Sequence, residues 1–303
     1  MFSSPATLQK GDQVAIIPPA NAIEPGYIAD AVGILEKWGL EVILSENINS
    51  RHFLYAGNDR QRQVSFQTLL DSSKVKCILS ARGGYGTTRI IDRLDFGKFR
   101  QQPKWIIGYS DLTSLLLRLF NLGIRGIHGP MPINFTDPGA GESLQRLKDI
   151  LFTGSSKPIV FPAIPQNIQG KSSGPVIGGN LSLLVNCIGT PDDYSTDNCI
   201  LFIEDVDEYY YRIDRMMVQM KRAGKLTGLS GLIVGHFTRL HDNERSFGAD
   251  IREIILDHVK TFNYPVCFGA PFGHEMPNFP ITVGGSFSLD VNAGQVVLKE
   301  DKG

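Results

Sequence analysis

The sequence lacks an excess of charge of either sign, with 30 Lys and Arg residues against 31 Asp and Glu residues. A protein that binds nucleic acid normally carries a basic surplus to neutralise phosphates, so this balance argues against that class of function. Hydrophobic residues make up 42 % of the chain, which excludes a disordered chain poor in apolar residues. We therefore expect a folded protein with no nucleic-acid partner.

The sequence also lacks any apolar run near the about 18 residues that a membrane-spanning helix needs. A secretory signal is not expected, because the apolar segment at residues 14–17 is short and is followed by Pro18 and Pro19. The four cysteines contain no Cys-x-x-Cys pair, which favours buried thiols over a disulfide framework or a zinc site. These absences predict a cytoplasmic protein with no membrane partner.

The first half of the chain alternates short β-rich runs with amphipathic helical patterns. Strands are predicted at residues 13–17, 41–44, 75–79 and 104–107, and helices at 28–38, 60–70 and 112–121. A helix between consecutive strands implies that the strands pair in parallel. We therefore predict that residues 1–152 form an α/β domain with a Rossmann-like parallel sheet.

The periodicity fails in residues 153–174, which are rich in Gly, Ser and Pro and are predicted to form a linker. Beyond them, residues 175–303 are predicted to form a smaller α/β domain with a β-rich end. Its predicted elements are helices at 180–188, 210–222 and 251–260, strands at 199–203 and 232–234, and a β-hairpin at 286–291 and 295–298.

The segment around Ser110 has the form of a nucleophile elbow. The serine stands at a predicted strand-to-helix turn, with Gly108 two positions before it. The backbone N–H of Asp111 would then lie at a helix N-terminus and could stabilise an oxyanion. The elbow of hydrolases has a second glycine where this chain has Leu112. The alternative is that Ser110 or Asp111 only caps the helix.

A glycine-rich segment at residues 81–86, Ala-Arg-Gly-Gly-Tyr-Gly, follows the third predicted strand. Its spacing does not fit the dinucleotide fingerprint, because the third glycine would fall at Arg89, and it has no Walker lysine. Its backbone N–H groups could form half of an oxyanion hole. The alternative is a tight turn that needs glycine for its backbone conformation.

Two further segments supply an acid and a base. Glu204 and Asp205 end a predicted strand, where neighbouring side chains point to opposite faces, so only one is expected to reach a given site. Asp205 also suits a helix cap for the segment that follows. His274 follows a glycine in a proline-rich loop and does not complete the HExxH zinc motif, because the fourth residue after it is Asn278.

Ser110, Glu204 and His274 together make a nucleophile, an acid and a base. A serine hydroxyl is a weak nucleophile until a base takes its proton, and the base needs a carboxylate to orient it. Each of the three lies at or after a predicted strand end, where α/β enzymes place their sites. We expect the three to meet in a cleft between the domains. The alternative is a two-domain binding protein without catalysis.

With these residues in this order, the sequence resembles the LD-carboxypeptidases, the family of murein tetrapeptide carboxypeptidases and related microcin-immunity peptidases. The resemblance covers most of the chain and depends on the order of its motifs. They are GDQVA at 11–15 with Pro18, AGND at 56–59 with Arg62, ARGGYG at 81–86, GYSD at 108–111, HGPM at 128–131, GGNL at 178–181, ED at 204–205 with YRIDR at 211–215, and GH at 273–274.

The resemblance implies a serine peptidase whose triad is Ser110, Glu204 and His274, with the backbone N–H groups of Asp111 and Gly84 as the oxyanion hole. Enzymes of this family are cytoplasmic, metal-independent and commonly dimeric, so the resemblance implies a homodimer that needs no cofactor. They remove terminal D-alanine from murein tetrapeptides by cutting the bond between an L-configured centre and the D-residue. From its charge and place, Arg82 is a candidate partner for the substrate carboxylate.

The resemblance leaves one alternative substrate open. Microcin-immunity peptidases use the same triad to cut the amide between an amino acid and a nucleotide-like group, and tend to carry an extra aromatic residue for stacking. This chain has only Trp38 and Trp105, and neither lies near Glu204 in the sequence. The sequence therefore favours the murein peptide.

Overall fold

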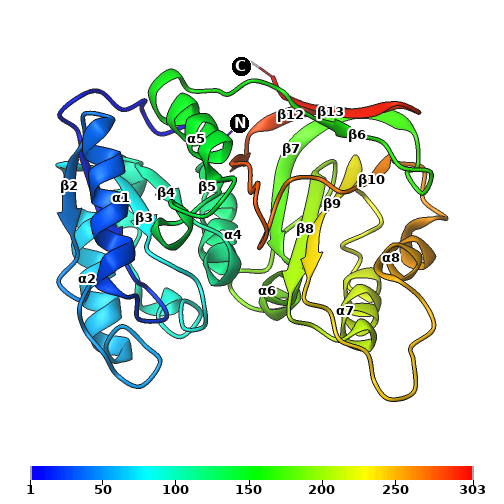
Figure 1. Ribbon diagram of the computed structural model, residues 1–303, viewed down its shortest axis with the longest axis horizontal. Helices are drawn as coiled ribbons and strands as arrows, with labels where there is room; N and C mark the ends of the chain where they lie inside the picture. The colour runs from blue at the N-terminus through cyan, green and yellow to red at the C-terminus, as the bar shows by residue number, and fades with distance from the viewer. Residues whose placement is uncertain (1, 302–303) are drawn as a thin grey trace. The chain divides into compact units, whose positions relative to one another are not determined.

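The computed structural model describes residues 2–301, which form two compact units (Figure 1). Unit 1 contains the chain up to Ser156 together with Met276–Thr282, and unit 2 contains Lys157–Glu275 and the residues from Val283 onward. Each unit has helices and a sheet with parallel strands, which confirms the predicted α/β class with a smaller second part. Among the described residues, every helix is too short or too polar to cross a membrane.

The sheet of unit 1 has the strand order β11-β5-β4-β3-β1-β2. Its strands are β1 (Gln13–Ile17), β2 (Glu41–Leu44), β3 (Val75–Ser80), β4 (Trp105–Ile107), β5 (Gly126–His128) and β11 (Ile281–Val283). Strands β1 to β5 pair in parallel. The chain moves from β1 outward to β2 and then returns to β3 on the other side of β1. The carboxyl ends of β1 and β3 therefore flank the switch point, where α/β sheets bind ligands.

Helices cover both faces of this sheet. They are α1 (Pro25–Lys37), α2 (Asp59–Asp71), α3 (Gly97–Gln101), α4 (Thr113–Asn121) and α5 (Ala140–Thr153), with the 3₁₀ turns η1 (Ile91–Arg93), η2 (Ser110–Leu112) and η3 (Pro132–Asn134) (Figure 1). Side chains alternate along a strand, so Val14 and Ile16 of β1 pack in one core with α1 and α5. The residues between them face the other side, where α2 contacts β1 and α4 contacts β5.

Unit 2 has a mixed seven-stranded sheet in the order β10-β9-β8-β7-β12-β13-β6. The bounds are β6 (Ile159–Pro162), β7 (Gly170–Asn180), β8 (Ile200–Val206), β9 (Gly231–Thr238), β10 (Val266–Phe268), β12 (Ser286–Val291) and β13 (Gln295–Glu300), with helices α6 (Leu181–Cys187), α7 (Tyr210–Arg222) and α8 (Ile251–Val259). Strands β7 to β10 are parallel and the hairpin β12–β13 is antiparallel. The carboxyl ends of β7, β8 and β9 therefore lie at the same end of the sheet.

Residues 153–174, predicted to be a linker, contain β6 and the first part of β7. Their Gly, Ser and Pro residues have low strand propensity, but β7 pairs with β12 along residues 170–175 and β13 pairs with β6. Pairing with neighbouring strands satisfies the backbone and outweighs local preference. The segment Met276–Thr282 joins unit 1 through contacts that are remote in the sequence, including the β11 strand.

Candidate active site

Ser110 lies at the tight turn between β4 and α4. Its backbone has a φ of 62°, in the left-handed region that residues other than glycine rarely adopt. A serine held in this conformation after a parallel strand is typical of a nucleophile elbow. The N-cap residue of α4 is Leu112, and that of the 3₁₀ turn η2 is Tyr109. The alternative that Ser110 or Asp111 serves as the N-cap of the helix is therefore wrong.

The glycine-rich segment at residues 81–86 passes directly beside Ser110. A Cβ atom built on Gly83 would lie 2.9 Å from the Ser110 Oγ. The backbone N–H of Tyr85 donates a hydrogen bond to Asn21 Oδ1 at 3.2 Å, which ties the segment to the loop after β1. Within residues 2–301, the exposed Gly84 donates no backbone hydrogen bond. Its N–H is therefore available to a ligand.

Arg82 is half-buried at the start of the same segment. One of its guanidinium nitrogens, Nη1, donates to the backbone oxygen of Ala22 at 3.2 Å. A guanidinium has five N–H donors, so this bond leaves donors for a carboxylate. The role of Arg82 in binding substrate remains a prediction.

Glu204 and His274, which are far apart in the sequence, are in contact in unit 2. Glu204 is fully buried, and its Oε2 lies 2.7 Å from His274 Nδ1. The pairing of β8 with β9 shifts register between Ile203 and Asp205, and such an irregularity can redirect the side chain of Glu204. A carboxylate that accepts from Nδ1–H fixes the imidazole tautomer, which leaves Nε2 as the proton acceptor.

Gly273 makes this contact possible. It has a φ of 120°, and a Cβ atom built on it would lie 2.8 Å from Glu204 Oε2. Only a residue without a side chain can take this conformation so close to the carboxylate. The glycine before His274 is thus part of the geometry that holds the imidazole.

His236 on β9 was not identified from the sequence, because it belongs to no recognisable motif. Burial lowers the pKa of His236. The negative charges of Glu275 and Glu204 act to raise this pKa, and the charge of His274 acts to lower it. The backbone N–H of His236 donates to Phe272 O at 2.8 Å, which holds the loop before His274. His236 is therefore a neutral neighbour of the acid–base pair at neutral pH.

Asp205 points away from the Glu204–His274 pair, as the alternation of side chains along a strand predicts. Its carboxylate accepts hydrogen bonds from Asn180 Nδ2 at 2.8 Å, Val206 N at 2.8 Å and Ser182 N at 3.0 Å. It therefore anchors the start of α6 and does not cap the segment after β8, since the N-cap of α7 is Tyr209. Burial, and then the charge of Glu204, raise its pKa to about 7 despite these bonds.

This raised pKa predicts a pH dependence of stability. An ordinary aspartate has a pKa of 3.8, so the folded protein binds more protons than the unfolded chain between that value and about 7. The contribution of Asp205 to the free energy of unfolding therefore falls as the pH rises through this window. Between pH 5 and pH 8, we expect the stability of wild type minus that of Asp205→Asn to fall by about 2–3 kcal/mol, measured by urea denaturation. A difference that stays constant with pH would contradict this.

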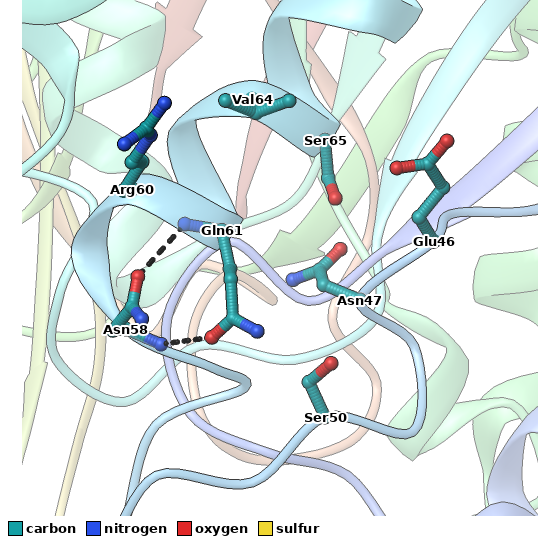
Figure 2. Close-up of a pocket in the computed structure, with 8 residues that line it drawn as sticks. All are labelled: Glu46, Asn47, Ser50, Asn58, Arg60, Gln61, Val64 and Ser65. Carbon is teal, nitrogen blue, oxygen red and sulfur yellow. Dashed lines mark hydrogen bonds between the residues drawn. The ribbon is translucent and has the colours of Figure 1, made fainter.

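A pocket of about 470 Å³ opens in unit 1 between the loop after β2 and the start of α2 (Figure 2). Its lining residues are Glu46, Asn47, Ser50, Asn58, Arg60, Gln61, Val64 and Ser65. Asn58 and Gln61 form a capping box, in which two hydrogen bonds satisfy the backbone N–H groups of these two residues. None of the predicted site residues lines this pocket. In the described part of the chain, no three His, Cys, Asp or Glu residues are grouped so as to hold a metal ion.

Two family models match the chain. The model of the LD-carboxypeptidase N-terminal domain matches residues 14–129, and that of the LD-carboxypeptidase C-terminal domain matches residues 173–289. A relative from Bacillus subtilis (strain 168), named "Probable murein peptide carboxypeptidase", is 33 % identical over 97 % of this chain and 94 % of its own length. The matches span both units.

The fold of this chain is also similar to that of solved structures. The crystal structure of a muramoyltetrapeptide carboxypeptidase from Oxalobacter formigenes is 29 % identical, with a TM-score of 0.85 over 96 % of this chain and 99 % of that one. The microcin C7 self immunity protein in its apo state has a TM-score of 0.87 over 99 % of both chains, at 21 % identity. At that identity the second likeness concerns the fold alone.

Proposed function

The chain belongs to the LD-carboxypeptidase family, and we propose that it is a serine carboxypeptidase that releases terminal D-alanine from murein tetrapeptides. The bond cut would join an L-configured centre to the D-residue. The observation that supports the chemistry best is the 2.7 Å contact of the buried Glu204 with His274 Nδ1. A buried carboxylate in this position orients an imidazole as a base. The names of the relatives support the choice of substrate.

Three side chains carry the proposed reaction. The Ser110 hydroxyl attacks the carbonyl carbon of the scissile bond while His274 Nε2 takes its proton. His274 then gives this proton to the nitrogen of the departing D-alanine, which leaves an ester on Ser110. Water, deprotonated by His274, cleaves that ester. Glu204 stabilises the imidazolium that forms in each half of the reaction, and no step uses a metal ion or a cofactor.

The backbone N–H groups of Gly84 and Asp111 would bind the oxyanion that forms on the carbonyl oxygen. Arg82, which follows β3 beside the same turn, would bind the carboxylate of the terminal D-alanine through its remaining donors. Recognition of that carboxylate is what separates a carboxypeptidase from an enzyme that cuts inside a peptide. The cytoplasmic location and the homodimer remain part of the proposal.

Release of D-alanine tests the proposed function. The purified protein is incubated with a tetrapeptide that ends in an L–D bond, and the products are identified by mass spectrometry. We expect free D-alanine and a tripeptide, with no cleavage of the all-L peptide of the same composition. Equal cleavage of the two peptides would refute the stereochemical claim.

The resemblance of the sequence to the microcin-immunity peptidases leaves one alternative open, cleavage of an aminoacyl-nucleotide amide, and the fold shared with the microcin C7 self immunity protein is compatible with it. An enzyme of that kind is expected to stack an aromatic side chain on the base. Both tryptophans of this chain belong to unit 1, and Trp105 is buried in β4 with its Nε1 donating to Ala6 O. The same assay with an added aminoacyl sulfamoyl nucleoside shows which of the two candidate substrates the enzyme cleaves.

A further inference from the structure

Arg62 on α2 has a fully buried side chain, which is rare for a charged residue. Its Nη1 donates to two backbone carbonyl oxygens, Pro19 O at 2.6 Å and Gly86 O at 2.8 Å. Its Nη2 pairs with Asp59, and its guanidinium lies over the Tyr55 ring at 4.8 Å from the centroid. The cation is therefore held by the loop after β1, by the glycine-rich segment and by its own helix.

A second buried charge binds the other end of the same peptide group. Gly86 O accepts from Arg62, and the next backbone N–H, that of Thr87, donates to Asp111 Oδ2 at 2.7 Å. Asp111 is 1 % exposed. One peptide group thus lies between a guanidinium and a carboxylate, and hydrogen bonds to charged groups are the strong ones. We call Arg62, the Gly86–Thr87 peptide group and Asp111 the clamp.

The charges of the clamp act on each other. Burial raises the pKa of Asp111, and the hydrogen bonds from Thr87 and Gly86 and the charge of Arg62 oppose that rise. Burial likewise lowers the pKa of Arg62, while the charges of Asp59 and Asp111 raise it. Removal of either end would leave the other buried with less compensation.

The clamp joins the two halves of the proposed oxyanion hole. Asp111 directly follows Ser110, and the Gly86–Thr87 peptide group ends the glycine-rich segment that carries Gly84. Fixing that group against Asp111 therefore fixes the Gly84 N–H relative to the Asp111 N–H. Catalytic donors need to be held within about 0.5 Å of the productive geometry.

We propose that Arg62 is a positioning residue, which clamps the Gly86–Thr87 peptide group against Asp111 and so holds the glycine-rich segment beside Ser110. This inference rests on the proposed function. Arg62 acts through the backbone and touches no reacting atom. Its loss is expected to affect stabilisation of the transition state more than binding of the substrate.

The test compares Arg62→Lys with wild type on the L–D tetrapeptide. Lysine keeps the charge but lacks the planar fork that serves Pro19 O, Gly86 O and Asp59 together. We expect kcat to fall about 100-fold, the loss typical of one misplaced oxyanion donor, while KM changes less than about threefold. Arg60→Lys is the matched control, because Arg60 is exposed on the same helix, and it should keep the wild-type kcat.

Two further variants keep the test decisive. Asp111→Asn removes the charge at the other end while its amide oxygen can still accept from Thr87 N–H, and we expect kcat to fall about tenfold. In Arg62→Ala, added methylguanidinium should restore part of the lost kcat by filling the vacated site. Should Arg62→Lys fail to fold, Asp111→Asn decides the question.

The outcomes separate the two proposals. A wild-type enzyme that releases D-alanine, with an unchanged kcat in folded Arg62→Lys or in Asp111→Asn, would overturn the clamp alone. A rise in KM without a fall in kcat would also overturn it. A wild-type protein without any turnover would refute the proposed function, and the clamp's role with it.

Discussion

Ser110→Ala is expected to lower kcat for D-alanine release by about 10⁴-fold or more, because the variant lacks the Ser110 hydroxyl that forms the ester intermediate. The variant should fold normally. Within the described residues the Ser110 Oγ makes no hydrogen bond, so its removal breaks none, and alanine meets the same backbone strain at a φ of 62°. Turnover measures the loss of activity, and the thermal unfolding midpoint measures whether the variant folds as the wild type does.

Ser73→Ala is the matched control for this substitution. Ser73 is exposed in unit 1 before β3, at the opposite end of the strand from the glycine-rich segment. It should keep the wild-type kcat. A Ser110→Ala protein that retained the wild-type rate would show that Ser110 is not the nucleophile.

Glu204→Gln is expected to lower kcat by about 10³–10⁴-fold, the loss seen when the carboxylate of a triad becomes an amide. The amide cannot stabilise the imidazolium of His274 by charge. It can also donate to Nδ1, which would hold the proton on Nε2 and leave the imidazole unable to act as a base. Turnover at several pH values measures the loss.

Asp205→Asn is the neighbouring control for Glu204→Gln. Its carboxylate binds the start of α6 rather than His274, so we expect it to cost far less activity. A second check combines Glu204→Gln with Ser110→Ala. Because the groups of a triad act as a unit, the double variant should be no slower than Ser110→Ala alone. A Glu204→Gln enzyme with the wild-type kcat would contradict the role given to Glu204.

The elements with strong local patterns were predicted well. The helix at 210–222 coincides with α7, and the strand at 13–17 coincides with β1. The strands β5, β10 and β11 have three residues each, too few to show any periodicity. Strand β7 was not expected because its Gly and Ser residues are stabilised by neighbouring strands, which no local pattern records.

In the candidate site, too, the sequence suggests the residue types but not the contacts between segments that are far apart in the chain. The order of residue types suggested Glu204 and His274 as partners, and the structure places them in contact, while their catalytic roles remain predictions. The buried position of Arg62 could not be foreseen, because it depends on two loops that follow different strands. The left-handed backbone of Ser110 was suggested only indirectly, by Gly108 before it.

The role of Ser110 as nucleophile is tested by comparing the D-alanine that equal amounts of wild-type and Ser110→Ala protein release from the same L–D tetrapeptide. We expect steady release by the wild type and a rate lower by about 10⁴-fold or more in the variant. Equal release by both proteins would contradict it, because hydrolysis would then proceed without the serine at the end of β4.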